Sequence, residues 1–155
     1  MDADIEKFFD RIPHAALKRT VRKYLSDRAL CRLIEAWLEA GALHNGLLQK
    51  RRGIPQGAVI SPFLCNLYLT ELDLRLSSAN LPFVRFADDL LLFATGREQA
   101  QKAFGFLAKE LRRLGLVLNQ HKTRVVQTGP HVVFLGKKLP KGLKTITAPT
   151  IPKRS

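Results

Sequence analysis

Two adjacent carboxylates, Asp88 and Asp89, interrupt a pair of apolar runs in the middle of the chain. Short runs rich in Phe, Val and Leu on both sides of such a break are typical of a buried β-hairpin, so residues 83–93 are predicted to form one. Like charges about 4 Å apart repel by roughly 4 kcal/mol at an effective dielectric of about 20, which favours a cation at this turn. Mg²⁺ suits the position, because it takes one or two carboxylates together with water and substrate phosphates. A solvated turn is the alternative, since aspartate is a common turn residue.

Composition limits the class of protein. The chain has 155 residues, with 26 Lys and Arg against 13 Asp and Glu, and a net charge of +13. This length is typical of one domain with a substantial core, and the charge predicts a polyanionic partner, with nucleic acid ahead of an anionic membrane. No run approaches the roughly 20 apolar residues of a membrane span, and the acidic N-terminus is unlike a signal peptide, so an intracellular protein without a membrane partner is predicted. Cys31 and Cys65 lack metal-ligand spacing and are interpreted as reduced core residues.

The segments around the hairpin predict a mixture of helices and strands. Before the hairpin, we expect a strand over residues 1–9, a helix from Pro13 with Asp10 as its cap, and a second helix capped by Ser26 or Asp27 and stopped by Gly41. A long buried helix capped by Ser61 should follow. After the hairpin, we expect a helix that opens with a capping box at Thr95 and Glu98 and ends at Gly115, and then strands over 116–118, 123–128 and 131–135. The apolar stripe of the second helix comprises Leu30, Leu33, Ile34, Trp37 and Leu38. This order predicts an α+β fold with helices on one face of a largely antiparallel sheet.

A split βαβ arrangement makes the first strand and the central hairpin neighbours in one sheet. Asp4 lies at the end of that first strand, so the arrangement would bring Asp4, Asp88 and Asp89 into one cluster. Three carboxylates in one place require a metal ion.

Five stretches match one family in order: the catalytic first motif at residues 4–14, the nucleotide- and template-contacting second motif at 52–62, the catalytic Phe-Ala-Asp-Asp at 86–89, the fourth motif at 115–123 and the primer-grip hairpin at 134–136. Together they resemble the palm of reverse transcriptases, most similar to the bacterial group II intron and CRISPR-associated branch. The resemblance implies a polymerase palm fold (split βαβ, ferredoxin-like) over residues 1–136, followed by a basic extended tail over 137–155, and a bacterial cytoplasmic protein.

The resemblance also implies an activity and its ligands. The expected reaction is RNA-directed DNA synthesis by two-metal-ion transfer, which extends a DNA primer 3′-hydroxyl on an RNA template with dNTPs. Asp4 and Asp88 would bridge two Mg²⁺ ions, for which Mn²⁺ can substitute. Asp89 would be an auxiliary ligand and the backbone carbonyl of Ile5 a further one.

Other positions match the family's substrate contacts. Phe9 falls where an aromatic ring excludes ribonucleotides, although ordinary core packing explains the residue as well. Lys122 matches a lysine near the triphosphate, with a solvated lysine as the alternative. The remaining expected contacts are Gln56, Gly57 and Ala87 with the nucleotide, Phe134, Leu135 and Gly136 as the primer grip, and Lys50, Arg51 and Arg52 with nucleic acid.

The family's fingers and thumb have no counterpart in these residues. We therefore expect a fragment of a larger protein or assembly, with weak or no activity alone and with exposed apolar surface that favours self-association. A basic, non-catalytic RNA-binding or assembly module with the same fold is the alternative, and another palm-type nucleotidyl transferase is a third. The intact Asp4, Asp88 and Asp89 argue against the non-catalytic alternative.

Overall fold

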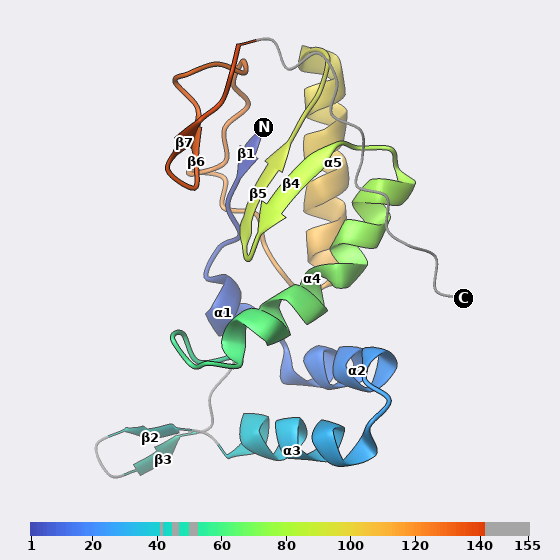
Figure 1. Ribbon diagram of the computed structural model, residues 1–155, viewed down its shortest axis with the longest axis vertical. Coiled ribbons are helices and arrows are strands. Elements are labelled where there is room, and N and C mark those ends of the chain that lie inside the picture. The colour runs from blue at the N-terminus through green and yellow to red at the C-terminus, as the bar shows by residue number, and fades with distance from the viewer. Residues whose placement is uncertain (41, 45–46, 50–52, 142–155) are drawn as a thin grey trace.

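A computed structural model describes residues 1–40, 42–44, 47–49 and 53–141 (Figure 1). The elements in chain order are β1 (Asp2–Ala3), α1 (Phe8–Arg11), α2 (His14–Tyr24), α3 (Arg28–Glu39), β2 (Ala42–His44), β3 (Leu47–Gln49), α4 (Ser61–Ser78), β4 (Phe83–Phe86), β5 (Asp89–Leu92), α5 (Arg97–Arg113), β6 (Val133–Phe134) and β7 (Lys137–Lys138). The basic run Lys50, Arg51 and Arg52 and residues 142–155 lie outside the described residues. None of the described helices is long and apolar enough to cross a membrane.

The central sheet has the strand order β1-β5-β4, and both pairings are antiparallel. Ala3 stands opposite Leu90 in the β1–β5 pair, and Phe86 stands opposite Asp89 in the hairpin. The predicted hairpin and its predicted neighbour, the first strand, are therefore confirmed. Two further antiparallel pairs, β2–β3 and β6–β7, form small sheets of their own.

Two long helices cover one face of the central sheet (Figure 1). Residues from the sheet, α4 and α5 belong to one buried cluster, which includes Leu90, Leu92, Leu69, Leu72, Leu76, Leu107 and Leu111. Helix α4 is apolar on most sides because it packs against α2 as well as α5. The architecture is the predicted α+β palm fold with helices on one sheet face.

Helices α2 and α3 form the end of the molecule remote from β1 in Figure 1. Asp27 caps α3, because its carboxylate accepts hydrogen bonds from the amides of Ala29 and Leu30 at 2.7 and 3.1 Å. The predicted apolar stripe of α3 is partly wrong. Leu30 and Leu33 are 41% and 67% exposed. The buried face consists of Cys31, Ile34 and Leu38, since these residues face α2 and the core.

The first nine residues do not form one strand as predicted. Lys7 has a φ of 46°, which turns the chain away from β1 into the short helix α1 and buries Phe8. Beyond β1, Ile5 forms an isolated antiparallel bridge with Leu118, and the pairing with β5 does not continue. Asp10 caps nothing, because Pro13 occupies the N-cap position of α2 without a side-chain hydrogen bond.

Several predicted helix caps and strands also differ. Helix α5 begins after Gly96, and the side chain of Gln99 accepts hydrogen bonds from Thr95 N and Oγ1 at 2.7 Å, so the predicted capping box is absent. Ser61 is the first residue of α4, and its hydroxyl donates to Pro55 O. Among the predicted C-terminal strands, those over 116–118 and 123–128 are reduced to isolated bridges, and residues 131–135 contain β6.

Two further predictions agree with the structure. Gly115 ends α5 with a φ of +72°, a conformation that glycine adopts without strain. Both cysteines are free and buried, and burial raises the pKa of the Cys65 thiol to about 12, so it is a core residue without thiolate chemistry. The predicted boundary between palm and tail falls inside the β6–β7 hairpin.

Candidate active site

Asp4 leaves the end of β1 and is held by the segment that matches the fourth motif. Asn119 Nδ2 donates to Asp4 Oδ2 at 2.9 Å, and Asn119 N donates to the Asp4 carbonyl at 2.8 Å. Thr123 Oγ1 lies 3.5 Å from the Asp4 amide. Sequence reasoning missed Asn119, although it lies within the stretch that carried the family resemblance. These contacts fix one oxygen of the half-buried Asp4 side chain and leave the other facing Lys122.

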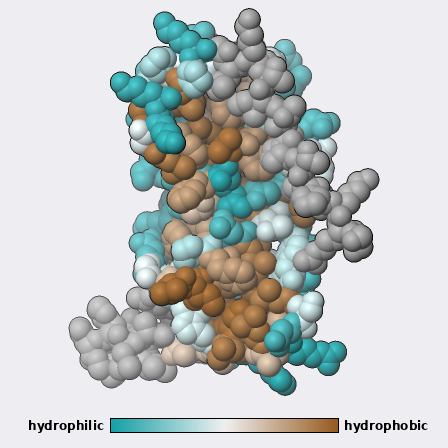
Figure 2. Space-filling view, in the orientation of Figure 1, coloured by the Kyte–Doolittle hydropathy of each residue, from teal (hydrophilic) through white to brown (hydrophobic). Residues whose placement is uncertain are grey.

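The β4–β5 hairpin presents the other two expected carboxylates. Its turn consists of Ala87 and Asp88, and Ala87 has a φ of 51° in the left-handed region. Asp88 is half-buried, whereas Asp89 at the start of β5 is exposed. Figure 2 shows a band of hydrophilic surface at the height of this turn in Figure 1, with more hydrophobic areas on both sides.

The carboxylates affect one another electrostatically. Burial raises the pKa of Asp88, and the charges of Asp89 and Asp4 raise it further, while its own backbone hydrogen bond and Lys122 oppose the shift. The pKa of Asp2 is also raised, first by burial and then by Asp89 and Asp4, against the N-terminus and Arg124. Sequence reasoning did not single out Asp2. Negative charge from β1 and from the hairpin therefore gathers at this end of the sheet.

The number and type of the available ligands decide whether a metal ion fits these residues. No group of three His, Cys, Asp or Glu side chains within the described parts of the chain is placed to hold one ion. The predicted three-carboxylate cluster is thus not assembled in these side-chain positions. Mg²⁺ needs only one or two carboxylates when a substrate supplies phosphates. Asp4, just after β1, and Asp88, in the β4–β5 turn, provide mutually repelling oxygen donors. The donor set suits a hard divalent cation.

The loop that matches the second motif is anchored to α1. Ile54 N donates to the Phe9 carbonyl at 2.7 Å, and His14 Nε2 contacts the Gly53 carbonyl. The loop then leads to Gln56 and Gly57, which are both exposed. These contacts anchor the second motif on the first, although Phe9 and Ile54 are 45 positions apart in the sequence.

Phe9 and Lys122, two expected substrate contacts, differ in their surroundings. Phe9 is half-buried, and its ring packs edge-on against Phe8 with 5.2 Å between the centroids, so core packing is part of its role. The Lys122 side chain is 70% exposed, with Nζ 3.9 Å from Asp4 Oδ1. A cation this close to Asp4 can also reach a phosphate bound beside it.

The expected primer grip lies on a separate hairpin. Phe134 ends β6, and the turn to β7 contains Leu135 and Gly136, with φ values of 50° and 75°. Figure 1 shows this hairpin beyond β1, apart from the β4–β5 turn. The structure therefore does not bring these residues into the group of carboxylates.

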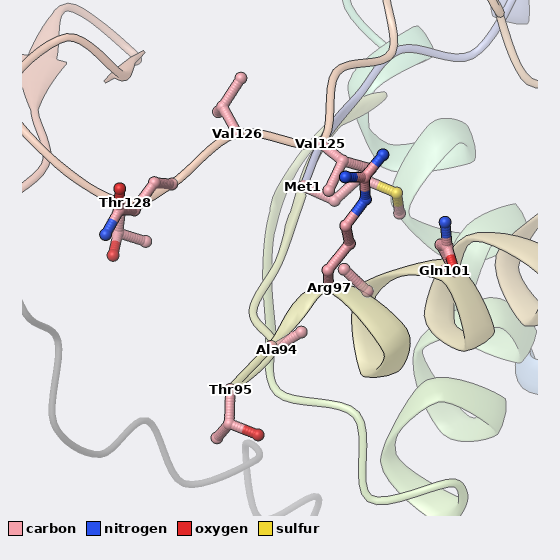
Figure 3. Close-up of a pocket in the computed structure, with 11 residues that line it drawn as sticks. Met1, Ala94, Thr95, Arg97, Gln101, Val125, Val126 and Thr128 are labelled. Atoms are coloured by element: carbon pink, nitrogen blue, oxygen red, sulfur yellow. The ribbon is translucent and has the colours of Figure 1, made fainter.

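A cavity of about 790 Å³ opens at the end of β5 opposite to Asp88 (Figure 3). Figure 3 shows Arg97 extending from the start of α5 toward Met1 and Val125, with Thr128 on the other side of the opening. No expected site residue lines it.

The fold and the carboxylate-bearing strands are those of a nucleic-acid polymerase palm. Residues 1–139 match the family model described as reverse transcriptase (RNA-dependent DNA polymerase), and the chain belongs to this family.

Two relatives resemble this chain in sequence, and one solved structure resembles it in fold. Protein YkfC of Escherichia coli K12 is 27% identical over 90% of this chain and 46% of its own length. The group II intron-encoded protein LtrA of Lactococcus lactis is 36% identical over 55% of this chain and 14% of its own length. A structure of Candida tropicalis telomerase with a fragment of telomeric RNA superposes with a TM-score of 0.65 at 16% identity, covering 99% of this chain and 31% of that one. The group II intron resemblance is confirmed, and the CRISPR association stays a prediction.

The chain spans less than half the length of these relatives, 46% of YkfC and 14% of LtrA.

Proposed function

We propose that this chain is the palm of an RNA-directed DNA polymerase, which extends a DNA primer on an RNA template. The observation that carries the proposal is the pairing of β1 with β5, because it sets Asp4 beside the hairpin turn of Asp88 in a chain of the reverse transcriptase family. The raised pKa of Asp88 supports it, since burial and repulsion between carboxylates are relieved when a cation binds.

Asp4 and Asp88, with the carbonyl of Ile5, would hold two Mg²⁺ or Mn²⁺ ions, and Asp89 would assist. Such ions activate the primer hydroxyl and stabilise the leaving pyrophosphate. The protein's own groups orient these ligands: Asn119 holds one oxygen of Asp4, and the turn presents Asp88.

The substrate contacts of the proposed site follow the residues around the carboxylates. Lys122, whose side chain is 70% exposed beside Asp4, would approach the dNTP phosphates. Phe9 would limit room beside the sugar, while Gln56, Gly57 and Ala87 would contact the nucleotide. The net charge of +13 supports binding of template and primer, to which Lys50, Arg51 and Arg52 would contribute. Phe134, Leu135 and Gly136 would support the primer.

We propose further that the palm acts within a longer protein that provides fingers and thumb. The proposal is supported by the lengths of the relatives, of which this chain covers less than half. It is also supported by the exposure of large apolar side chains: Phe63 is 46%, Phe86 61% and Leu135 51% exposed. Uncovered apolar surface of this kind also favours self-association of the isolated chain.

Primer extension tests the proposal. An RNA-templated DNA primer, dNTPs and Mg²⁺ are supplied to the chain alone and to the chain joined to the segments of LtrA that precede and follow the matched stretch. We expect little extension by the chain alone, because positioning contributes several kcal/mol to catalysis, and robust extension by the joined protein. Asp88→Ala should abolish that extension. RNA binding without extension in both forms would favour the non-catalytic RNA-binding or assembly module.

A further inference from the structure

Arg85 is a charged residue inside the fold that the proposed chemistry does not use. It lies on β4, and its side chain is only 9% exposed. Its Nε and Nη2 donate to the two carboxylate oxygens of Asp73 on α4 at 2.8 and 2.5 Å. Its Nη1 donates to Asn66 Oδ1, also on α4, at 2.8 Å, and to the carbonyl of Ala87 at 2.9 Å. One guanidinium thus joins the helix to the turn of the hairpin.

The acceptor on the turn is significant because of peptide geometry. The Ala87 carbonyl and the nitrogen and Cα of Asp88 lie in one rigid plane, so a hydrogen bond to this carbonyl orients the backbone of Asp88. Ala87 has a φ of 51°, which a non-glycine residue adopts only when its surroundings hold it there. The bidentate pair with Asp73 fixes the guanidinium itself, since a planar fork on a carboxylate allows little rotation.

We propose that Arg85 is a positioning residue for Asp88. It is anchored on α4 by Asp73 and Asn66, and it holds the Ala87–Asp88 peptide in the orientation that presents the Asp88 carboxylate beside Asp4. The claim that this orientation matters for catalysis rests on the proposed function. The claim that Arg85 holds the turn does not rest on it.

The first test measures the turn directly. In Arg85→Lys the charge stays but the fork is lost, so the amides of Phe86 and Asp89, the pair that flanks the turn, should exchange with deuterium about tenfold faster, as expected when a local structure loses roughly one good hydrogen bond. Amides in α5 should keep their protection, which separates a loosened turn from general unfolding. Arg22→Lys is the matched control, because Arg22 makes the same bidentate contact with Glu35 at 2.6 and 2.7 Å on α2 and α3. Unchanged exchange at the turn in Arg85→Lys would overturn the inference.

A milder variant covers the case in which Arg85→Lys does not fold. Asn66→Ala removes one of the two acceptors of Nη1 and keeps the pair with Asp73, so we expect a smaller increase in exchange, confined to the amides of Phe86 and Asp89. Two results together would show that Arg85 supports the fold rather than the turn: Arg85→Lys does not fold, and Asn66→Ala folds with the same exchange pattern as the wild type.

The second test connects the turn to the metal site. Binding of Mn²⁺ to the chain, followed by electron paramagnetic resonance, should weaken about tenfold in Arg85→Lys, since residues that orient metal ligands affect affinity by roughly 10–100-fold. It should be unchanged in Arg22→Lys. In the joined enzyme, Arg85→Lys should lower kcat and leave KM for dNTP nearly unchanged. Equal Mn²⁺ affinity and kcat in wild type and Arg85→Lys would contradict the inference. A wild type that binds no Mn²⁺ would contradict the proposed function instead, and the exchange experiment would still decide the role of Arg85.

Discussion

Gly53 makes the second-motif loop sensitive to a single methyl group. An ideal Cβ at this position would lie 2.0 Å from the Phe9 carbonyl oxygen and 2.6 Å from the Asp10 carbonyl carbon. The backbone also has a φ of +78°. Both obstacles are backbone atoms of α1, which cannot rotate away as a side chain does. Gly53→Ala should therefore force the loop away from the first motif.

The size of this effect can be worked out from the two causes. The left-handed conformation costs an alanine about 1–2 kcal/mol. Insertion of a methyl group into filled space costs about 1–3 kcal/mol more, so the total is roughly 2–5 kcal/mol. For a chain of this length, each kcal/mol lowers Tm by about 2–4 °C, which predicts a decrease of roughly 4–20 °C.

Gly57→Ala is the control for the cost of the left-handed backbone conformation in the absence of a steric clash. Gly57 has a φ of +80°, and among the described residues other than its chain neighbours no heavy atom lies within 4 Å of its ideal Cβ. Its substitution should cost only the conformational part, about 1–2 kcal/mol. Thermal and urea unfolding of both variants measure the difference. Equal destabilisation by the two substitutions would refute the argument that the Gly53–Phe9 approach anchors the loop.

Three further predictions concern stability and binding. Tyr68→Phe should destabilise the chain by about 1–3 kcal/mol in urea unfolding, because the buried Tyr68 hydroxyl donates to Leu114 O, which would lose its partner; an unchanged midpoint would contradict this. The raised pKa of Asp88, caused by burial and then by Asp89 and Asp4, means that the folded state holds this proton more tightly. This contribution to stability is present below about pH 4 and is lost as pH rises through the raised pKa, so in EDTA the melts of Asp88→Asn should depend less on pH than those of the wild type. Affinity for an RNA/DNA hybrid should fall steeply between about 50 and 200 mM salt, and a flat titration would exclude phosphate contacts as the source of binding.

Local patterns in the sequence predicted much of what surrounds the candidate site. The apolar runs beside Asp88 and Asp89 predict a hairpin because both strands and the turn lie within eleven consecutive residues. Asp27 and Gly115 likewise mark helix ends by the hydrogen-bonding and conformational properties of single residues. The family resemblance then assigned metal-binding roles to Asp4, Asp88 and Asp89, which lie in or beside these local elements.

The tertiary structure decided which partner each group takes. Arg85 and Asp73 are twelve positions apart, and only the packing of β4 on α4 makes them a pair that reaches the Ala87 carbonyl. Residues 123–128 have the composition of a strand, yet only Arg124 finds a bridging partner, because strand formation depends on a neighbouring strand rather than on propensity. The exposure of Leu33 has the same kind of cause: periodicity defines an apolar stripe, but the position of α2 determines which side of it is buried.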